Sequence, residues 1–85
     1  MIHLGELAER LELPGEALGA CRITVTGGNR AVIENHKGLL EYTPETVEVS
    51  GGKQRLRISG AELVLRAMSR DMLIITGKIF EVEVI

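Results

Sequence analysis

The chain has 85 residues, with 12 acidic and 10 basic side chains, a net charge of −2, one cysteine, one Phe and one Tyr. This length suits one small domain with a thin core. One cysteine allows neither an internal disulfide nor a cysteine-rich metal cluster. The lack of a disulfide is usual in a reducing, intracellular setting. The slight acidity and scarce aromatic residues argue against a nucleic-acid binder, and no apolar run reaches the roughly 20 residues of a membrane-spanning helix.

The first 20 residues predict a short helix followed by a turn. In residues 2–13 apolar side chains recur every three or four positions, which predicts a helix of about three turns with one apolar stripe. Pro14 ends this helix, because proline has no N–H to donate and restricts the residue before it. Residues 15–19 then predict one short turn.

From Cys21 onward apolar and polar residues alternate, which is the period of β-strands. Residues 61–68 suit a helix as well as a strand, and we favour the strand. A glycine follows a β-branched residue and a hydroxyl residue at four places, including Gly60 and Gly77, and we interpret each glycine as the end of a strand. The predicted strands cover residues 21–26, 30–34, 39–42, 46–50, 55–59, 61–68, 72–76 and 78–85.

These elements predict a mainly β fold. We expect a single small domain of seven or eight short antiparallel strands in a meander, because successive strands without crossover helices pair with their neighbours. A sandwich or a partly closed barrel would bury one face of each strand beneath the N-terminal helix. We assign residues 1–20 to the helix and turn, and residues 21–85 to the β-meander, in one structural domain overall.

The polar segment Glu34, Asn35, His36, Lys37 and Gly38 is the first candidate site. It lies between two apolar strands and predicts a hairpin or another tight strand–turn–strand connection, with Gly38 free to take a positive φ. The structural interpretation is that the imidazole bonds the backbone of a neighbouring strand. The functional interpretation is that this turn contacts a partner protein. We assign no catalytic, cofactor-binding or metal-binding residue.

Two other functions stay open. An enzyme or small-ligand binder would gather His36, Glu34 and Glu41 around a pocket, whereas Cys21 suits a small buried hydrophobe better than a nucleophile. A self-assembling subunit, or homo-oligomer, would pair its C-terminal strand with another strand if that strand lay at a sheet edge. Arg55 and Arg57 share one face of a strand, as do Glu81 and Glu83, and these two pairs would face each other within the chain or between subunits.

The chain resembles the YabP/YqfC family of sporulation proteins of endospore-forming Firmicutes, and its YqfC branch in particular. The resemblance extends from about residue 13 to the C-terminus, and it implies a role in endospore formation in the cytoplasm of the mother cell, with other sporulation proteins as partners. It implies no established enzymatic activity, cofactor or catalytic residue. It is carried by Ile33-Glu34-Asn35-His36-Lys37-Gly38-Leu39-Leu40-Glu41-Tyr42, by Leu56-x-Ile58-x-Gly60-x-x-Leu63, by Leu73-Ile74-Ile75-Thr76-Gly77-Lys78-Ile79, and upstream by Leu13-Pro14 and Arg22-Ile23-Thr24.

Overall fold

A computed structural model describes residues 2–3, 10–13 and 21–85, and every element within these ranges is a strand. The predicted mainly β, antiparallel character is confirmed. None of these residues forms a helix that is long and apolar enough to cross a membrane. The strands are β1 (Ile2–His3), β2 (Arg10–Leu13), β3 (Arg22–Thr26), β4 (Arg30–Glu34), β5 (Gly38–Tyr42), β6 (Thr46–Ser50), β7 (Arg55–Met68) and β8 (Met72–Val84).

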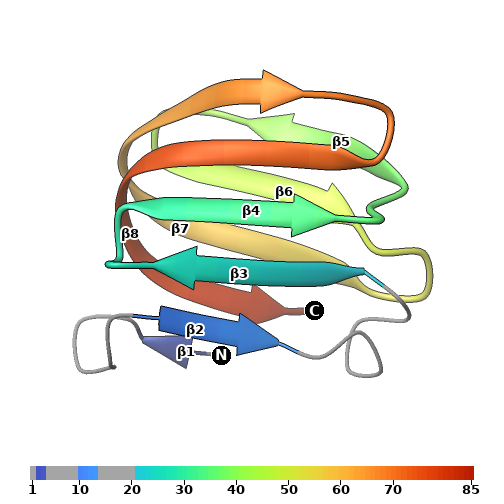
Figure 1. Ribbon diagram of the computed structural model, residues 1–85, viewed down its shortest axis with the longest axis horizontal. Coiled ribbons are helices and arrows are strands. Elements are labelled where there is room, and N and C mark those ends of the chain that lie inside the picture. The colour runs from blue at the N-terminus through green and yellow to red at the C-terminus, as the bar shows by residue number, and fades with distance from the viewer. Residues whose placement is uncertain (1, 4–9, 14–20) are drawn as a thin grey trace.

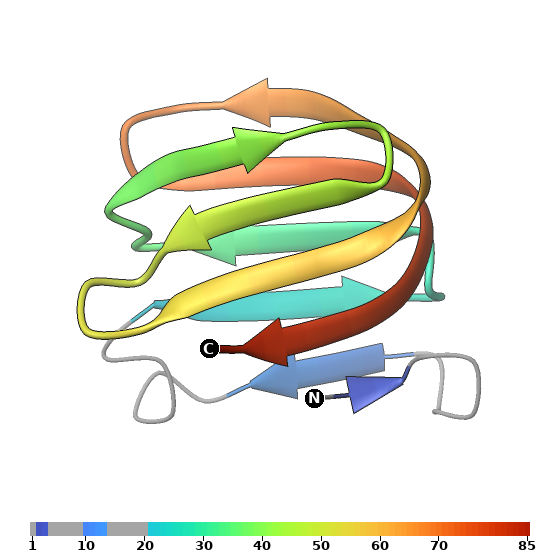
Figure 2. The ribbon, with the colours of Figure 1, turned by 180° about the vertical axis from the view of Figure 1, so that it is seen from behind.

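The strands form one eight-stranded antiparallel sheet in the order β2-β3-β4-β8-β7-β6-β5, with β1 paired to β8. β7 and β8 have 14 and 13 residues, and both bend near their middle, so the sheet folds over on itself into two layers (Figures 1 and 2). One layer holds β2, β3 and β4 with the first half of β8 and the second half of β7. The other holds β5 and β6 with the first half of β7, the second half of β8 and β1.

Two glycines allow the paired strands β7 and β8 to bend. A Cβ atom on Gly60 would overlap the carbonyl oxygen of Lys78, and one on Gly77 (φ 132°) would overlap the carbonyl of Glu62 and lie 2.9 Å from the Cα of Leu63. The register shifts at the same place, with Glu62 in the left-handed region at φ 54°. Such bulges bend a strand and increase its twist. Gly60 and Gly77 therefore lie inside long strands, and the prediction that they end strands is wrong.

The hydrophobic core lies between the two layers, because alternate side chains of β3, β4, β6, β7 and β8 point inward. Cys21 joins this core as a buried small residue, as predicted. Leu39, Leu65 and Val84 pack against the core from partly buried positions. The fully or almost fully buried apolar side chains are those of Cys21, Ile23, Val25, Ala31, Ile33, Val47, Val49, Leu56, Ile58, Leu63, Leu73, Ile75, Ile79 and Val82.

The predicted helix over residues 2–13 is wrong wherever the structure describes that range. Ile2–His3 pairs with β8, and Arg10–Leu13 pairs with β3. A helix of about three turns is marginal by itself, whereas the edge of β3 offers unpaired N–H and C=O groups that an extended segment satisfies. Residues 4–9 and the turn predicted at residues 15–19 lie outside the described residues. The strand prediction for residues 61–68 is confirmed, since they belong to β7.

The simple meander is also wrong, because β8 lies between β4 and β7. β4 pairs with β3 and β8, and β5 pairs with β6, so residues 34–38 form no hairpin. They carry the chain from one layer to the other (Figure 1), and we call them the β4–β5 arch. We call residues 69–71 the β7–β8 turn. β8 has neighbours on both sides, so the C-terminal strand is not the free edge on which self-pairing was predicted.

Candidate functional site

The β4–β5 arch is fixed by its own backbone and by two neighbouring segments. Asn35 adopts φ 60° and Gly38 adopts φ 155°, which reverse the chain direction between the layers. The Asn35 N–H donates to the Asp71 carbonyl oxygen at 2.7 Å, and the Lys37 N–H donates to the Ser50 carbonyl oxygen at 2.7 Å. The arch is therefore tied to the β7–β8 turn on one side and to the end of β6 on the other.

His36 is the buried side chain of the arch, with only 7% of its surface exposed. Neither Nδ1 nor Nε2 has a hydrogen-bond partner in the described part of the chain, although both atoms are buried. The predicted bond from the imidazole to a neighbouring backbone is therefore absent. His36 therefore contributes no side-chain hydrogen bond to the described part of the fold, and an unpaired buried polar group of this kind costs about 1–3 kcal/mol.

A cavity of about 510 Å³ lies between the arch and the β7–β8 turn, lined by Asn35, His36, Lys37, Arg70 and Asp71. We call it the arch hollow. Lys37 and Arg70 are exposed and have no ion-pair partner among the described residues, and the exposed Asp71 supplies one negative charge. The arch hollow therefore combines exposed cations with a buried imidazole that has no partner among the described residues.

Sequence reasoning placed Asn35, His36 and Lys37 in one candidate turn, and the structure places all three against the arch hollow. It missed Arg70 and Asp71. Their segment predicted only a chain reversal, and they meet the arch because the β7–β8 turn returns beside it. Glu34 and Gly38 end and begin the flanking strands and do not line the hollow.

The predicted pocket of His36, Glu34 and Glu41 is not assembled. Both glutamates are exposed outside the arch hollow, and Glu41 lies on β5 opposite Glu48 of β6. Cys21 does not line the hollow either. Burial raises the pKa of the Cys21 thiol, against the opposing effect of a hydrogen bond from the Arg22 backbone, so the thiol stays protonated more readily than a free cysteine.

No group of three or more His, Cys, Asp or Glu residues within residues 2–3, 10–13 and 21–85 lies in an arrangement that could hold a metal ion. The imidazole of His36 therefore has no carboxylate or thiolate set gathered around it in this part of the chain. The arrangement at the arch suits hydrogen bonding and ion pairing with a bound group.

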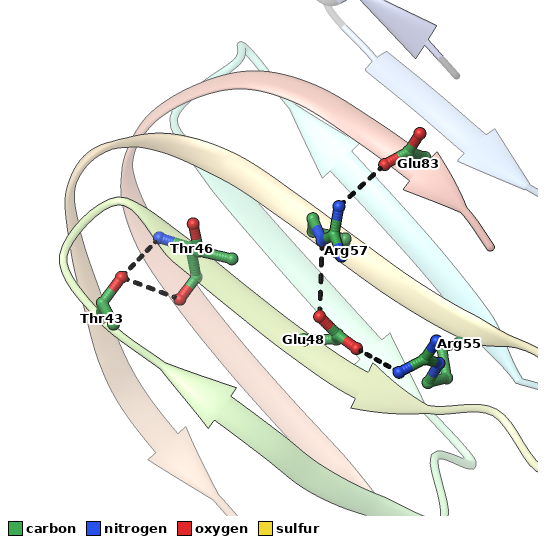
Figure 3. A network of polar contacts seen from close by, with 6 residues as sticks. All are labelled: Thr43, Thr46, Glu48, Arg55, Arg57 and Glu83. Carbon is green, nitrogen blue, oxygen red and sulfur yellow. Dashed lines mark hydrogen bonds and ion pairs between the residues drawn. The ribbon is translucent and has the colours of Figure 1, made fainter.

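A second set of charges lies on the outer face of β6, β7 and β8 (Figure 3). Arg55 Nη1 lies 3.1 Å from Glu48 Oε1, Arg57 Nε lies 3.4 Å from Glu48 Oε2, and Arg57 Nη1 lies 3.4 Å from Glu83 Oε1. The prediction that the two pairs face each other within one chain is thus confirmed for Arg57 and Glu83. Arg55 lies beside the buried Glu48, whose central role was missed. These two arginines are paired inside the chain, so they are less available to a partner than Lys37 and Arg70.

The sequence model of the YabP family matches residues 17–84. The chain belongs to the YabP family. The match includes the whole arch and the β7–β8 turn, so every residue lining the arch hollow lies within the YabP region. The chain is also 31% identical over 74 residues to the uncharacterized protein YqfC of Bacillus subtilis (strain 168), across 86% of this chain and 80% of that protein. These findings confirm the resemblance drawn from the arch and its flanking strands. No solved structure matches the chain significantly.

Proposed function

We propose that the protein is a non-enzymatic adaptor in endospore formation, which acts in the mother-cell compartment by contacting other sporulation proteins through the β4–β5 arch. Membership of the YabP family supports the process, since the chain resembles the sporulation proteins of that family in the arch itself. The arch joins two layers of one small β domain, and it presents polar groups at the surface of an otherwise packed framework.

The observation that carries this proposal is the state of His36. Within the described residues neither nitrogen of the buried imidazole has a hydrogen-bond partner, so the ring can bond a group that a partner supplies. Backbone bonds to Asp71 and Ser50 hold the arch in one conformation before any partner arrives. Preorganisation of this kind raises affinity because less conformational entropy is lost on binding.

The proposal is tested by variants of the arch in sporulating cells of an endospore-forming bacterium. Lys37→Ala removes an exposed charge of the arch hollow, and Lys53→Ala removes an exposed charge of the β6–β7 turn outside it. We expect both variants to fold, as judged by circular dichroism and thermal unfolding, and only Lys37→Ala to lower the count of heat-resistant spores and to lose partners in crosslinking and pull-down from sporulating cells.

His36→Phe extends this test, because it keeps the volume of the ring and removes both nitrogens. We expect a folded protein that fails in the spore count. Folded Lys37→Ala and His36→Phe proteins that both give normal spores would remove the functional claim for the arch. An unfolded His36→Phe protein would show that the imidazole is structural.

Self-association through a strand edge is a second candidate, and its edge is β5. Among the described strands β5 pairs only with β6, and its Leu40 and Tyr42 side chains are 52% and 43% exposed. Exposed edges with apolar side chains favour pairing with another strand. Sedimentation velocity across a range of concentrations tests this, with Leu40→Lys as the matched variant. A mass that stays monomeric at every concentration would exclude it.

A further inference from the structure

The charges around the arch hollow define which ligand it accepts. Lys37 and Arg70 each carry one positive charge, Asp71 carries one negative charge, and the buried His36 adds none while it is neutral. The lining therefore has a net charge of about +1. One monovalent anion neutralises this lining, whereas a divalent phosphate would leave an excess negative charge beside Asp71.

His36 adds a hydrogen bond to this charge. A neutral imidazole has one N–H donor and one acceptor nitrogen, and neither is used within the described residues. Both nitrogens have almost no exposed surface, so a ligand can bond the ring only if the groups that cover it move on binding. Lys37 and Arg70 are exposed, and they are the side chains that would move to meet an anion.

We infer that the arch hollow binds a carboxylate of an acidic segment in a partner protein, with Lys37 and Arg70 pairing with the carboxylate and His36 donating an N–H to it. This inference rests on the proposed adaptor function and names the chemistry of its partner. A single exposed ion pair is weak, so the ligand is a peptide segment whose neighbouring residues add contacts and not a free small acid. Arginine suits a carboxylate because its guanidinium binds both oxygens at once.

The inference is tested with the full-length protein and a fluorescent hexaglutamate peptide, by anisotropy at low salt, with hexaglutamine as the uncharged peptide. The matched variants are Arg70→Gln and Lys37→Gln in the hollow, and Lys78→Gln on β8 near the bend, away from the hollow. We expect each hollow variant to weaken hexaglutamate binding about threefold to fivefold, and Lys78→Gln to change it less than about twofold.

The ¹⁵N signals of His36 provide a measurement that non-specific electrostatic attraction would not change. We expect the ¹⁵N signals of its imidazole to shift when hexaglutamate binds the wild-type protein, and His36→Phe to weaken binding about threefold with the fold unchanged. Equal losses in Lys78→Gln and Arg70→Gln would overturn the inference, because they would show non-specific attraction. Displacement of the peptide by an equal concentration of inorganic phosphate would overturn it in favour of a phosphate site.

The two proposals can fail separately. If partners are lost from Lys37→Ala in pull-down but hexaglutamate does not bind, the carboxylate inference is wrong and the adaptor function stands. If hexaglutamate binds as expected but Lys37→Ala and His36→Phe both sporulate normally, the hollow binds carboxylates and the adaptor function of the arch is wrong.

Discussion

The two ends of the molecule differ in the hydrogen bonding of one polar side chain, Tyr42 at one end and His36 at the other. At the end where β7 and β8 bend, the Tyr42 hydroxyl donates to the Leu63 carbonyl oxygen at 3.1 Å and accepts from the Leu65 N–H at 3.3 Å. At the other end the buried His36 makes no hydrogen bond within the described residues. Figures 1 and 2 show the bends and the arch at opposite ends of the layers. We call these the closed end and the open end.

Backbone bonds reinforce the closed end. The Gly60 N–H donates to the Glu45 carbonyl oxygen at 2.9 Å, the Leu63 N–H to the Pro44 carbonyl oxygen at 2.8 Å, and the Ile79 N–H to the Gly28 carbonyl oxygen at 2.8 Å. The closed end therefore satisfies its polar groups within the chain, and it stabilises the fold. The open end also bonds its backbone, through the N–H groups of Asn35 and Lys37, but within the described residues it leaves both nitrogens of His36 without a partner.

The largest effect should come from breaking the closed end at Gly77. Gly77→Ala places a Cβ against the backbone of Glu62 and Leu63, and we expect unfolding free energy to fall by about 3 kcal/mol or more. Gly52→Ala is the control, because Gly52 has a positive φ of 98° but its Cβ would meet only the Lys37 Cγ at 3.8 Å. That variant should lose about 1 kcal/mol. Urea denaturation measures both, and equal losses would show that the close approach at Gly77 is unimportant.

Tyr42→Phe removes the two hydrogen bonds of the Tyr42 hydroxyl and changes the shape of the side chain little. We expect a loss of about 1 kcal/mol, because Leu63 and Leu65 lose a partner but Tyr42 is 43% exposed and water can replace its hydroxyl. Hydrogen exchange of the Leu65 amide should accelerate, whereas exchange at the arch should not change. Unchanged exchange at Leu65 would mean that the Tyr42 hydroxyl does not protect the Leu65 N–H.

His36→Phe should act in the opposite direction from Tyr42→Phe. Replacing a buried polar ring without partners by an apolar ring of similar shape is neutral or stabilising, so we expect unfolding free energy to stay constant or rise by about 1 kcal/mol. Urea denaturation of the two variants side by side checks the sign. A loss greater than about 2 kcal/mol in His36→Phe would show that the imidazole stabilises the open end, and the contrast between the ends would disappear.

The smallest effect concerns Cys21, which lies in the core shared by both ends. Because burial raises its pKa, the thiolate fraction is lower than that of a free cysteine at every pH below the raised pKa, and modification by a thiol reagent should be slow in the native protein. We expect Gly77→Ala to accelerate this modification and His36→Phe to leave it unchanged. Fast labelling of the wild-type protein would show that Cys21 is accessible.

Sequence reasoning succeeded where the signal is local and failed where it depends on distant partners. Alternation predicted the strands from residue 21 onward, including residues 61–68, since every one of these strands except β5 buries alternate side chains. It read the ranges around Gly60 and Gly77 as four separate short strands, because glycine is common both at strand ends and at bulges. It read residues 2–13 as a helix, although β3 and β8 supply ladders for parts of that range.

The amino-acid sequence by itself determined the all-β character, the family and the polar residues of the arch, because strand periodicity and the motif around His36 are written in neighbouring positions. Only the tertiary structure decided that the arch crosses between layers, that Arg70 and Asp71 join it, and that the buried imidazole has no partner in the described part of the chain. The physical reason is that strand order depends on which distant edges pair, and β8 pairs with β4 from across the chain. That pairing separates β4 from β5, so the predicted hairpin is an arch that connects the two layers.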